Sequence, residues 1–250
     1  MYFKTDAVVL KKTKLSDSDL ILTLFTRKSG KMTVVSKGAR NSKSKLSAAS
    51  HPFVFGEYNI TTSDKWNYLN SVDINDSFYH LREDLTKLSY ASYILELTNY
   101  SVGENASNIR LFELLVELLN LMNRGDENYG LLKIAYEYKL MDILGYRLNM
   151  KHCVSCGKSS DIKKFYISPT EGGLICEECH TKVENSFYVG KTLPKLLEYL
   201  VEKDIRLIYK TKINDDYIKR LDQIARPYIF HFLERKTFKS LEFLDTIKDM

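Results

Sequence analysis

The chain has 250 residues, of which 44% are apolar and 12% aromatic, so it is long enough and apolar enough to build packed cores, and extensive disorder is excluded. Its formal net charge is only +5, but residues 1–50 carry eleven Lys or Arg against three Asp, and the remaining residues sum to −3. A basic end joined to a near-neutral remainder is typical of a local surface for a polyanion, either nucleic acid or an acidic membrane face.

The N-terminal segment holds only a four-residue apolar run, Ala7 to Leu10, which is far shorter than the ~7 to 15 apolar residues of a signal peptide. No stretch approaches the ~18 to 20 apolar residues of a membrane helix. The four cysteines of the chain are too few for a disulfide framework and suit a reducing compartment. We therefore expect a soluble, cytoplasmic protein without a membrane partner.

Five short segments near the N-terminus are rich in Val, Ile, Leu, Thr and aromatic residues, which predicts strands. They are residues 5–10, 20–26, 32–36, 53–60 and 66–74. Gly30 supplies the positive φ that a tight hairpin between the second and third strands needs. Five short antiparallel strands with one long intervening loop are compatible with a small closed barrel such as the OB-fold, and also with an SH3-like barrel.

The long loop contains the sequence SKGARNSKSKLSA, residues 36–48, which we call the basic loop because it carries four cations and no acid. A charge run is more often a solvated face than a binding site, but barrels of this class commonly bind single strands between their long loops. We therefore predict a DNA-binding surface made of the basic loop and neighbouring cations of the barrel. The candidate residues are Lys11, Lys14, Arg27, Lys28, Lys31, Lys37, Arg40, Lys43 and Lys45.

From residue 78 the apolar period changes from two to 3.6, which predicts helices. Apolar stripes begin at Phe78, Leu111 and Leu131, and Gly145 stands where a C-terminal cap belongs. Helical patterning resumes after residue 192. Pro227 lies within the last amphipathic run and predicts a kink or break, because proline removes a backbone hydrogen bond and crowds the preceding turn.

Residues 150–187 form a short insert, poor in apolar residues, that must be held by something other than its own core. It contains Cys153, Cys156, Cys176 and Cys179, which are two Cys-x2-Cys pairs separated by nineteen residues. This spacing is typical of zinc ribbons, because each pair directs two sulfurs at one point and two pairs complete a tetrahedron. Four protein ligands leave no open position, so we predict one structural Zn²⁺ and no catalytic metal.

Other states of these thiols fit the sequence less well. Free thiols, disulfides and iron in a rubredoxin-like arrangement remain alternatives, whereas a thioredoxin-like redox pair requires a βαβ unit that the sequence lacks. His152 and His180 flank the cysteines, and we expect them outside the ligand set. A nucleobase deaminase is excluded, because its H-x-E and P-C-x-x-C elements are absent.

No catalytic residue can be assigned. The Walker pattern, the nucleophile elbow G-x-S-x-G and the metalloprotease motif H-E-x-x-H are all absent from the sequence. The carboxylates form no cluster that the sequence distinguishes from surface charge. We therefore expect a binding protein and not an enzyme.

Several motifs together resemble one known family, the RecO recombination mediators of bacteria. They are the segment Asp17–Leu24, the T-x-x-x-G-K of Thr26–Lys31, the basic loop, the YILEL of Tyr93–Leu97, the LGY of Leu144–Tyr146, the EGGLICEEC of Glu171–Cys179 and the FKSLEFL of Phe238–Leu244. Their order and spacing, more than any single motif, carry the resemblance, which covers nearly the whole chain.

The resemblance implies an α+β multidomain protein with an N-terminal five-stranded OB-fold barrel at 1–77, a helical domain at 78–149 and 188–250, and an inserted zinc ribbon with four cysteine ligands at 150–187. Members of this family bind single- and double-stranded DNA, anneal complementary strands and, with RecR, help to load RecA onto DNA coated by single-strand-binding protein. The family binds the acidic tail of that protein through its helical domain, where Lys133 and Lys139 lie near the expected segment. A cytoplasmic, nucleoid-associated protein is expected.

A second reading is a zinc-ribbon regulator of transcription or translation, which also binds nucleic acid. Such a regulator prefers one sequence or one RNA structure, whereas a recombination mediator does not. A metal-dependent nuclease needs a second metal site with an open coordination position. Tests of sequence preference and of magnesium-dependent cleavage therefore separate these classes.

Overall fold

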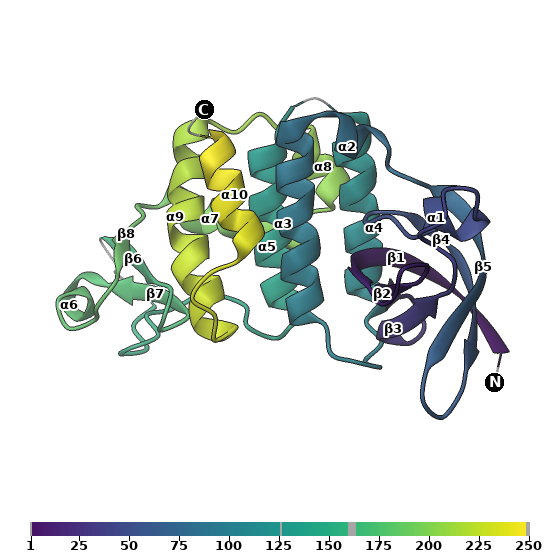
Figure 1. Cartoon of the computed structure of the whole chain (residues 1–250). Helices are drawn as coiled ribbons and strands as arrows, with labels where there is room; N and C mark the ends of the chain where they lie inside the picture. Colours follow the sequence, from purple (N-terminus) through teal and green to yellow (C-terminus); the bar gives the residue numbers. More distant parts are fainter. Residues whose placement is uncertain (1, 126, 160–163, 249–250) are drawn as a thin grey trace. The chain divides into compact units, whose positions relative to one another are not determined.

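The computed structural model describes residues 2–125, 127–159 and 164–248 and divides the chain into two compact units. The barrel unit contains Met1–Asp126 and Phe238–Met250, and the ribbon unit contains Glu127–Thr237. Each unit combines strands with helices (Figure 1). None of the helices in these residues combines the length and apolarity that a membrane crossing requires.

Five strands close into a barrel in the barrel unit. They are β1 (Tyr2–Lys14), β2 (Leu20–Thr26), β3 (Gly30–Ser36), β4 (Phe55–Thr62) and β5 (Asn67–Asp76). Their order is β1-β2-β3-β5-β4, and every neighbouring pair is antiparallel except β3 and β5, which pair in parallel at Val35 and Tyr68. This is the order of an OB-fold barrel, so the predicted fold class is confirmed and the SH3-like alternative is not supported.

Alternate residues along the strands fill the inside of the barrel, which is the period that predicted strands. The buried cluster consists of Ala7, Val9, Leu22, Leu24, Met32, Val34, Val54, Tyr58, Ile60 and Leu69. Val8 and Phe25 point to the other face and are also fully buried. That face is covered by a helix, since the Phe25 and Phe55 rings lie 5.5 and 6.2 Å from the ring of Phe112.

The helices of the barrel unit are α1 (Lys45–Ala49) within the barrel and α2 (His80–Glu83), α3 (Leu85–Ser101), α4 (Ile109–Arg124) and α10 (Lys239–Lys248) beside it. α3 contacts both β1 and α10, and Figure 1 shows α3 and the yellow α10 side by side. The stripe predicted from Phe78 is partly wrong. Phe78 precedes α2 with a φ of 46°, and Leu85 at the start of α3 is 53% exposed.

The ribbon unit is built around α5 (Tyr129–Ile143), which packs against α7 (Thr192–Glu202), α8 (Ile205–Tyr209) and α9 (Asp215–Phe232). Every described side chain from Leu131 to Met141 is buried, so α5 is a central helix with contacts on all sides. Gly145 ends it as predicted, with a φ of 90°, and the following N–H of Tyr146 donates to the carbonyl of Met141 at 2.8 Å.

The insert folds as three short strands, β6 (Phe165–Ser168), β7 (Gly173–Cys176) and β8 (Phe187–Tyr188), with the short helix α6 (Glu177–His180) after β7. The strand order is β7-β6-β8, and Figure 1 shows these elements as a small group of their own. We call residues 150–188 the ribbon.

Two features differ from the sequence-based expectations. α9 continues without a break through Pro227, because the packed side chains of Ala225, Tyr228 and Ile229 hold the helix on both sides of the missing N–H donor. The predicted helical domain is also divided between the two compact units. α2, α3, α4 and α10 belong to the barrel unit, whereas α5 and α7–α9 belong to the ribbon unit.

Candidate metal centre and nucleic-acid surface

The ribbon brings its four cysteines to one point. Cys153 and Cys156 lie in a turn in which the N–H of Gly157 donates to the carbonyl of Cys153 at 2.8 Å. Gly157 has a φ of 75°, which a residue with a side chain rarely adopts. Cys176 ends β7, and Cys179 follows one turn later in α6. Both Cys-x2-Cys pairs therefore owe their positions to local backbone turns.

The sulfur positions fit a tetrahedral metal ion. All four Sγ atoms lie within 4.8 Å of one another, and those of Cys156 and Cys176 are 3.8 Å apart. A regular tetrahedron with Zn–S bonds of about 2.3 Å has S–S edges of about 3.8 Å. No other group of possible metal ligands is found among the described residues. The four predicted ligands are thus brought together as a metal site, and four thiolates of this geometry suit zinc or iron.

The surroundings of the cysteines shift the pKa values of two of their thiols in opposite directions. Burial raises the pKa of the Cys153 thiol, but three backbone N–H groups, the first of them from Cys176, lower it to about 6 overall. At Cys179 the Ser155 hydroxyl lowers the pKa, whereas the neighbouring thiols and burial raise it to about 12. The four thiols therefore do not all ionise unaided, and a bound cation would supply the charge needed to hold four thiolates together.

The two flanking histidines lie outside the ligand set, as predicted. The His152 ring is 3.0 Å from the Asn149 side chain. His180 stacks on Tyr166 with ring centroids 3.9 Å apart and contacts the Ser186 hydroxyl at 3.1 Å. Their rings hold the ribbon's loops against its strands.

The basic loop is tied to the preceding turn of the barrel. Asp19 accepts a hydrogen bond of 2.8 Å from the backbone N–H of Gly38, and this bond, with the Ser18 hydroxyl, holds the pKa of Asp19 below its ordinary value. The Arg40 guanidinium donates to the carbonyls of Ser16 and Asp17 at 3.0 and 2.9 Å. The loop is therefore an ordered platform, and α1 begins within it at Lys45.

The nine predicted DNA-binding cations divide into two groups. Five are exposed and pair with no acidic side chain among the described residues: Lys11, Lys28, Lys37, Lys43 and Lys45. Of these, Lys37 lies over the Tyr68 ring at 4.7 Å. The five side chains are available to a polyanion.

The other four cations make contacts within the barrel unit. Arg27 lies 3.2 Å from Glu113 and 3.4 Å from Asp6, and Lys31 donates to the carbonyl of Asn99 at 3.0 Å. Lys14 pairs with Asp17 at 2.9 Å, and the Arg40 guanidinium lies 3.7 Å from the same carboxylate. Arg27 and Lys31 thus join the barrel to the helices that cover it.

Lys133 and Lys139, the predicted contacts for an acidic partner, are both buried. Lys133 Nζ lies 2.8 Å from Glu137 Oε1 and 2.5 Å from Asp222 Oδ1. Burial alone lowers the pKa of Lys133, but the two carboxylates outweigh it and raise the pKa. Lys139 Nζ donates to the carbonyls of Val201 and Lys203. Neither ammonium group is presented to a partner at the surface.

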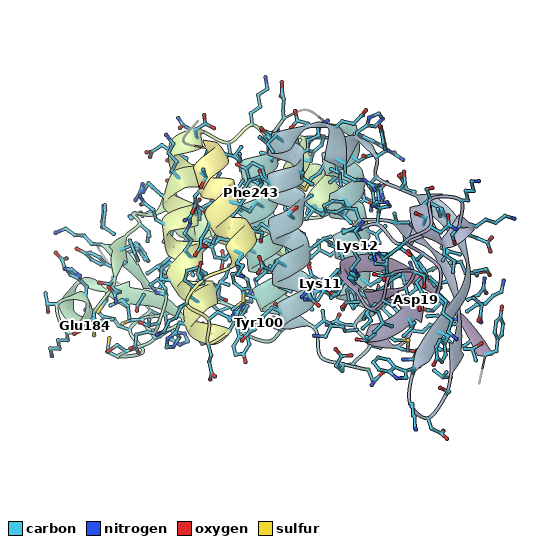
Figure 2. The ribbon with its side chains drawn as sticks, viewed as in Figure 1. Lys11, Lys12, Asp19, Tyr100, Glu184 and Phe243 are labelled. Atoms are coloured by element: carbon cyan, nitrogen blue, oxygen red, sulfur yellow. The ribbon has the colours of Figure 1, made fainter. Side chains whose placement is uncertain are left out.

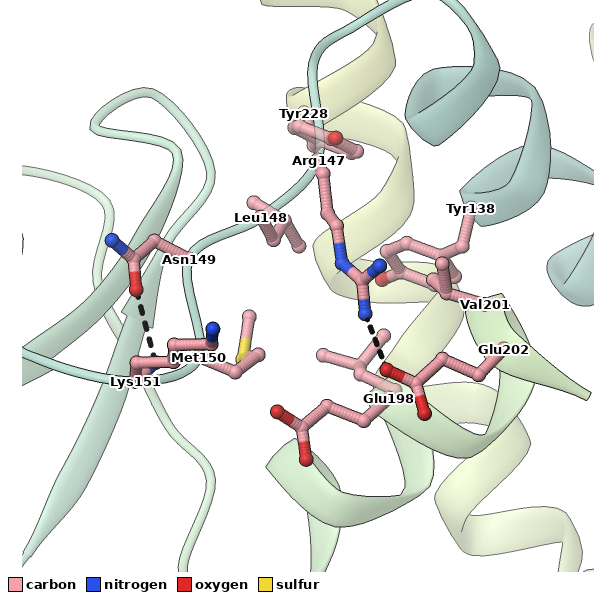
Figure 3. A pocket seen from close by; sticks show the side chains of 11 residues that line it. Tyr138, Arg147, Leu148, Asn149, Met150, Lys151, Glu198, Val201, Glu202 and Tyr228 are labelled. Atoms are coloured by element: carbon pink, nitrogen blue, oxygen red, sulfur yellow. Dashed lines mark hydrogen bonds and ion pairs between the residues drawn. The ribbon is translucent and has the colours of Figure 1, made fainter.

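The ribbon unit has a pocket of about 460 Å³ between α5, α7, α9 and residues 147–151. Figure 3 shows Arg147 extending across it to Glu202, with 2.8 Å between Nη2 and Oε1. The lining residues are Tyr138, Arg147, Leu148, Asn149, Met150, Lys151, Leu197, Glu198, Val201, Glu202 and Tyr228. Sequence reasoning did not find this pocket, because its walls come from four separate segments.

Sequence reasoning also missed a contact at the end of β1. Lys12 Nζ lies 3.1 Å from His51 Nδ1, and Arg82 of α2 acts electrostatically on both. The only sequence signal was the Lys11-Lys12 pair (Figure 2), because the other two residues are 39 and 70 positions further along the chain.

Comparisons with known proteins agree over nearly the whole chain. Residues 1–78 match the family described as Recombination protein O N terminal, and residues 82–242 match Recombination protein O C terminal. The chain is 37% identical over 242 residues to the DNA repair protein RecO of Alkaliphilus metalliredigens, which covers 97% of this chain and 98% of that protein. It is 32% identical over 247 residues to DNA repair protein RecO of a Thermoanaerobacter species, covering 99% and 98% of the two chains.

Proposed function

This chain belongs to the recombination protein O family of DNA repair proteins, and from that membership we propose that it is a recombination mediator that binds DNA backbones without sequence preference. It binds single- and double-stranded DNA, anneals complementary strands and, with RecR, helps to load RecA onto DNA coated by single-strand-binding protein. It acts in the cytoplasm at the nucleoid. It forms or breaks no covalent bond and is not an enzyme.

One observation supports this proposal above the others. Five exposed ammonium groups of the barrel, three of them on the basic loop, form no ion pair within 4 Å among the described residues. Such groups displace condensed counterions from DNA, so log affinity falls with log salt by about 0.7 per phosphate neutralised on a single strand and about 0.9 on duplex. Annealing follows because one cationic surface reduces the repulsion between two strands.

The test replaces Lys37, Lys43 and Lys45 together by Gln. Arg40 stays unchanged because its guanidinium holds the turn at residues 16–17. We expect the salt slope for a single-stranded oligonucleotide to fall by about 2, by a similar amount for unrelated sequences. The matched control, Lys210, Lys212 and Lys236 to Gln, removes the same charge from exposed positions of the ribbon unit. An unchanged slope in the basic-loop variant removes that loop from the interface.

The mediator and regulator readings are separated by two further assays. A mediator anneals complementary strands coated with single-strand-binding protein, and it binds unrelated oligonucleotides alike. Strong preference for one sequence or one RNA structure instead supports the zinc-ribbon regulator of transcription or translation. Strand cleavage with added magnesium supports an enzyme and contradicts the proposal.

We propose Zn²⁺ as the ion of the ribbon, held by Cys153, Cys156, Cys176 and Cys179. With four protein ligands it supplies no catalytic position and contributes folding free energy. We expect about one equivalent of zinc per chain in purified protein. Fewer than about 0.5 equivalents, or iron in its place, contradicts this assignment.

The pocket of the ribbon unit is the proposed site for the acidic tail of single-strand-binding protein. We propose this pocket as the binding site instead of Lys133 and Lys139, because the ammonium groups of those two residues are buried. Arg147 and Lys151 line it together with Glu198, Glu202 and several apolar side chains, so a tail carboxylate would replace Glu202 as the partner of Arg147. We expect Arg147→Ala to weaken binding of a tail peptide while leaving the salt slope for DNA unchanged. Equal peptide affinity for both proteins contradicts this location.

A further inference from the structure

Lys12, His51 and Arg82 come from three segments of the barrel unit and form what we call the cationic cluster. Lys12 lies in the last part of β1, His51 follows α1, and Arg82 belongs to α2. Lys12 Nζ is 3.1 Å from His51 Nδ1. The ammonium group donates to Nδ1, so the ring carries its proton on Nε2, which remains a donor.

The backbone fixes this arrangement. The register between β1 and β2 shifts between Val9 and Lys11, which re-aims the end of β1. At the shift, Val9 exchanges two backbone hydrogen bonds of 3.0 Å with Phe53 and Val54, and these hold the segment after His51 beside β1. The Arg82 guanidinium donates from Nη2 to the carbonyl of Ser77. All three side chains are therefore positioned by main-chain contacts.

The cluster has no counter-charge. Among the described residues none of the three side chains pairs with a carboxylate, whereas Lys4, Arg27 and Lys31 each have an acidic neighbour within 4 Å. The Nε atom of Arg82 is buried and has no hydrogen-bond partner. Lys12 and His51 are thus in direct contact, and Arg82 acts electrostatically on both, in a chain that pairs other partly covered cations with acids.

The pKa values of the three groups show that their charged forms are disfavoured in the folded chain. Burial lowers the pKa of Lys12, His51 and Arg82, and mutual repulsion lowers it further for Lys12 and His51. Only Tyr79 opposes the change, at Arg82. A bound anion favours the charged forms of all three groups.

We propose that the cationic cluster binds a phosphate group of a nucleic-acid strand, through residues that are not part of the basic loop. The guanidinium group matches the paired oxygens of a phosphate, and the ammonium and imidazole groups add donors from other directions. That the phosphate belongs to DNA rests on the proposed function. The chemistry of the site rests on the cluster alone.

The experiment compares full-length wild type with Lys12→Gln, Lys12→Arg and the matched control Lys212→Gln. Anisotropy of a labelled single-stranded oligonucleotide is measured at 50 and 200 mM salt. For Lys12→Gln we expect the ratio of the two affinities to fall by about 2.6-fold, which corresponds to one lost phosphate contact. Lys12→Arg keeps the charge and is expected to keep the wild-type ratio, as is Lys212→Gln.

A second arm follows the His51 ring by NMR during titration with inorganic phosphate and, separately, with the oligonucleotide. The His51→Gln variant identifies the ring signals. We expect them to shift with the oligonucleotide, and this shift to be lost in Lys12→Gln. If the ring responds to inorganic phosphate while the affinity ratio of Lys12→Gln is unchanged, the site holds free phosphate and its assignment to DNA is overturned.

No response in either arm overturns the whole proposal. If wild type does not bind DNA at all, the proposed function fails, and the phosphate titration still decides the chemistry of the cluster. The two proposals therefore fail in distinguishable ways.

Discussion

The barrel and the ribbon are both built from short strands, but they are stabilised by different interactions. The barrel closes on itself and encloses a cluster of buried apolar residues contributed by all five strands. The ribbon has one open three-stranded sheet, and its buried cluster contains Ile175 and two of the metal-binding cysteines. A sheet of that size with so little apolar surface is marginal in water. The barrel therefore depends on side-chain packing, whereas we expect the ribbon to depend on the proposed metal ion.

Removal of the metal is the strongest test of this difference. Apparent binding free energies of structural zinc are about 10 to 16 kcal/mol near neutral pH, so chelation or Cys176→Ser is expected to unfold the ribbon. Segment-resolved hydrogen exchange checks this result. Protection is expected to fall in β6 and β7 and to persist in β1–β5, and DNA affinity is expected to change less than ribbon protection. A ribbon that stays protected without metal contradicts the comparison.

Leu24→Ala tests the barrel side of the comparison. Leu24 is fully buried in the barrel cluster, and truncation of such a leucine costs about 2.7 to 5 kcal/mol of stability. Chemical unfolding of the barrel unit, followed by exchange of β2 amides, measures the loss. Leu24→Met, which keeps the volume, is expected to cost less than about 1.5 kcal/mol. Zinc content stays at the wild-type level if the ribbon is independent.

Alanine substitutions at two glycines of the barrel unit test how much close packing contributes to its stability. Gly30 and Gly38 have φ values of 68° and 65°, so alanine is strained at both, by about 1 to 2 kcal/mol. A Cβ added at Gly30 would lie 2.1 Å from the carbonyl oxygen of Ala106, whereas a Cβ added at Gly38 would have no atom within 4 Å. Gly30→Ala is therefore expected to be the more destabilising change in thermal unfolding. Equal losses show that the contact with Ala106 relaxes freely.

The smallest expected effect is the pH dependence of the basic loop. The pKa of Asp19 is lowered in the folded chain, so its contribution to stability is present above 3.8 and is lost as pH falls through the lowered value. Exchange of the Gly38 amide is expected to accelerate relative to neighbouring amides in that acidic range. Asp19→Asn removes the carboxylate and is expected to abolish this pH dependence. An identical profile in both proteins rules out Asp19 as its cause.

The sequence predicts best what depends on local backbone pattern. The second strand lies at its predicted bounds, because residues 20–26 are all Leu, Ile, Thr or Phe and a glycine turn follows them. The four cysteines form the predicted metal site because each pair spans a single turn. Pro227 shows the limit of this reasoning. A local rule predicts a kink or break, but neighbouring side chains buried in the ribbon unit keep the helix unbroken.

The candidate DNA surface shows the same limit. Lys31 and Lys43 look alike in the sequence, yet Lys31 donates to Asn99, 68 residues away, and Lys43 remains exposed. The family resemblance puts Lys133 and Lys139 near a partner-binding segment, but the helix that carries them is buried on all sides. Charge is visible in a sequence, but the partner of a charge is visible only after folding.

The sequence by itself determined the approximate positions of the five barrel strands, the cap at Gly145 and the two Cys-x2-Cys turns, because each depends on residues within one turn or one strand of each other. Only the tertiary structure decided which cations are available to an anion and which are paired. It brought Lys12, His51 and Arg82 together without an acid, and it placed Lys133 between Glu137 and Asp222. The physical reason is that electrostatic energy depends on distance and burial, and chain folding sets both.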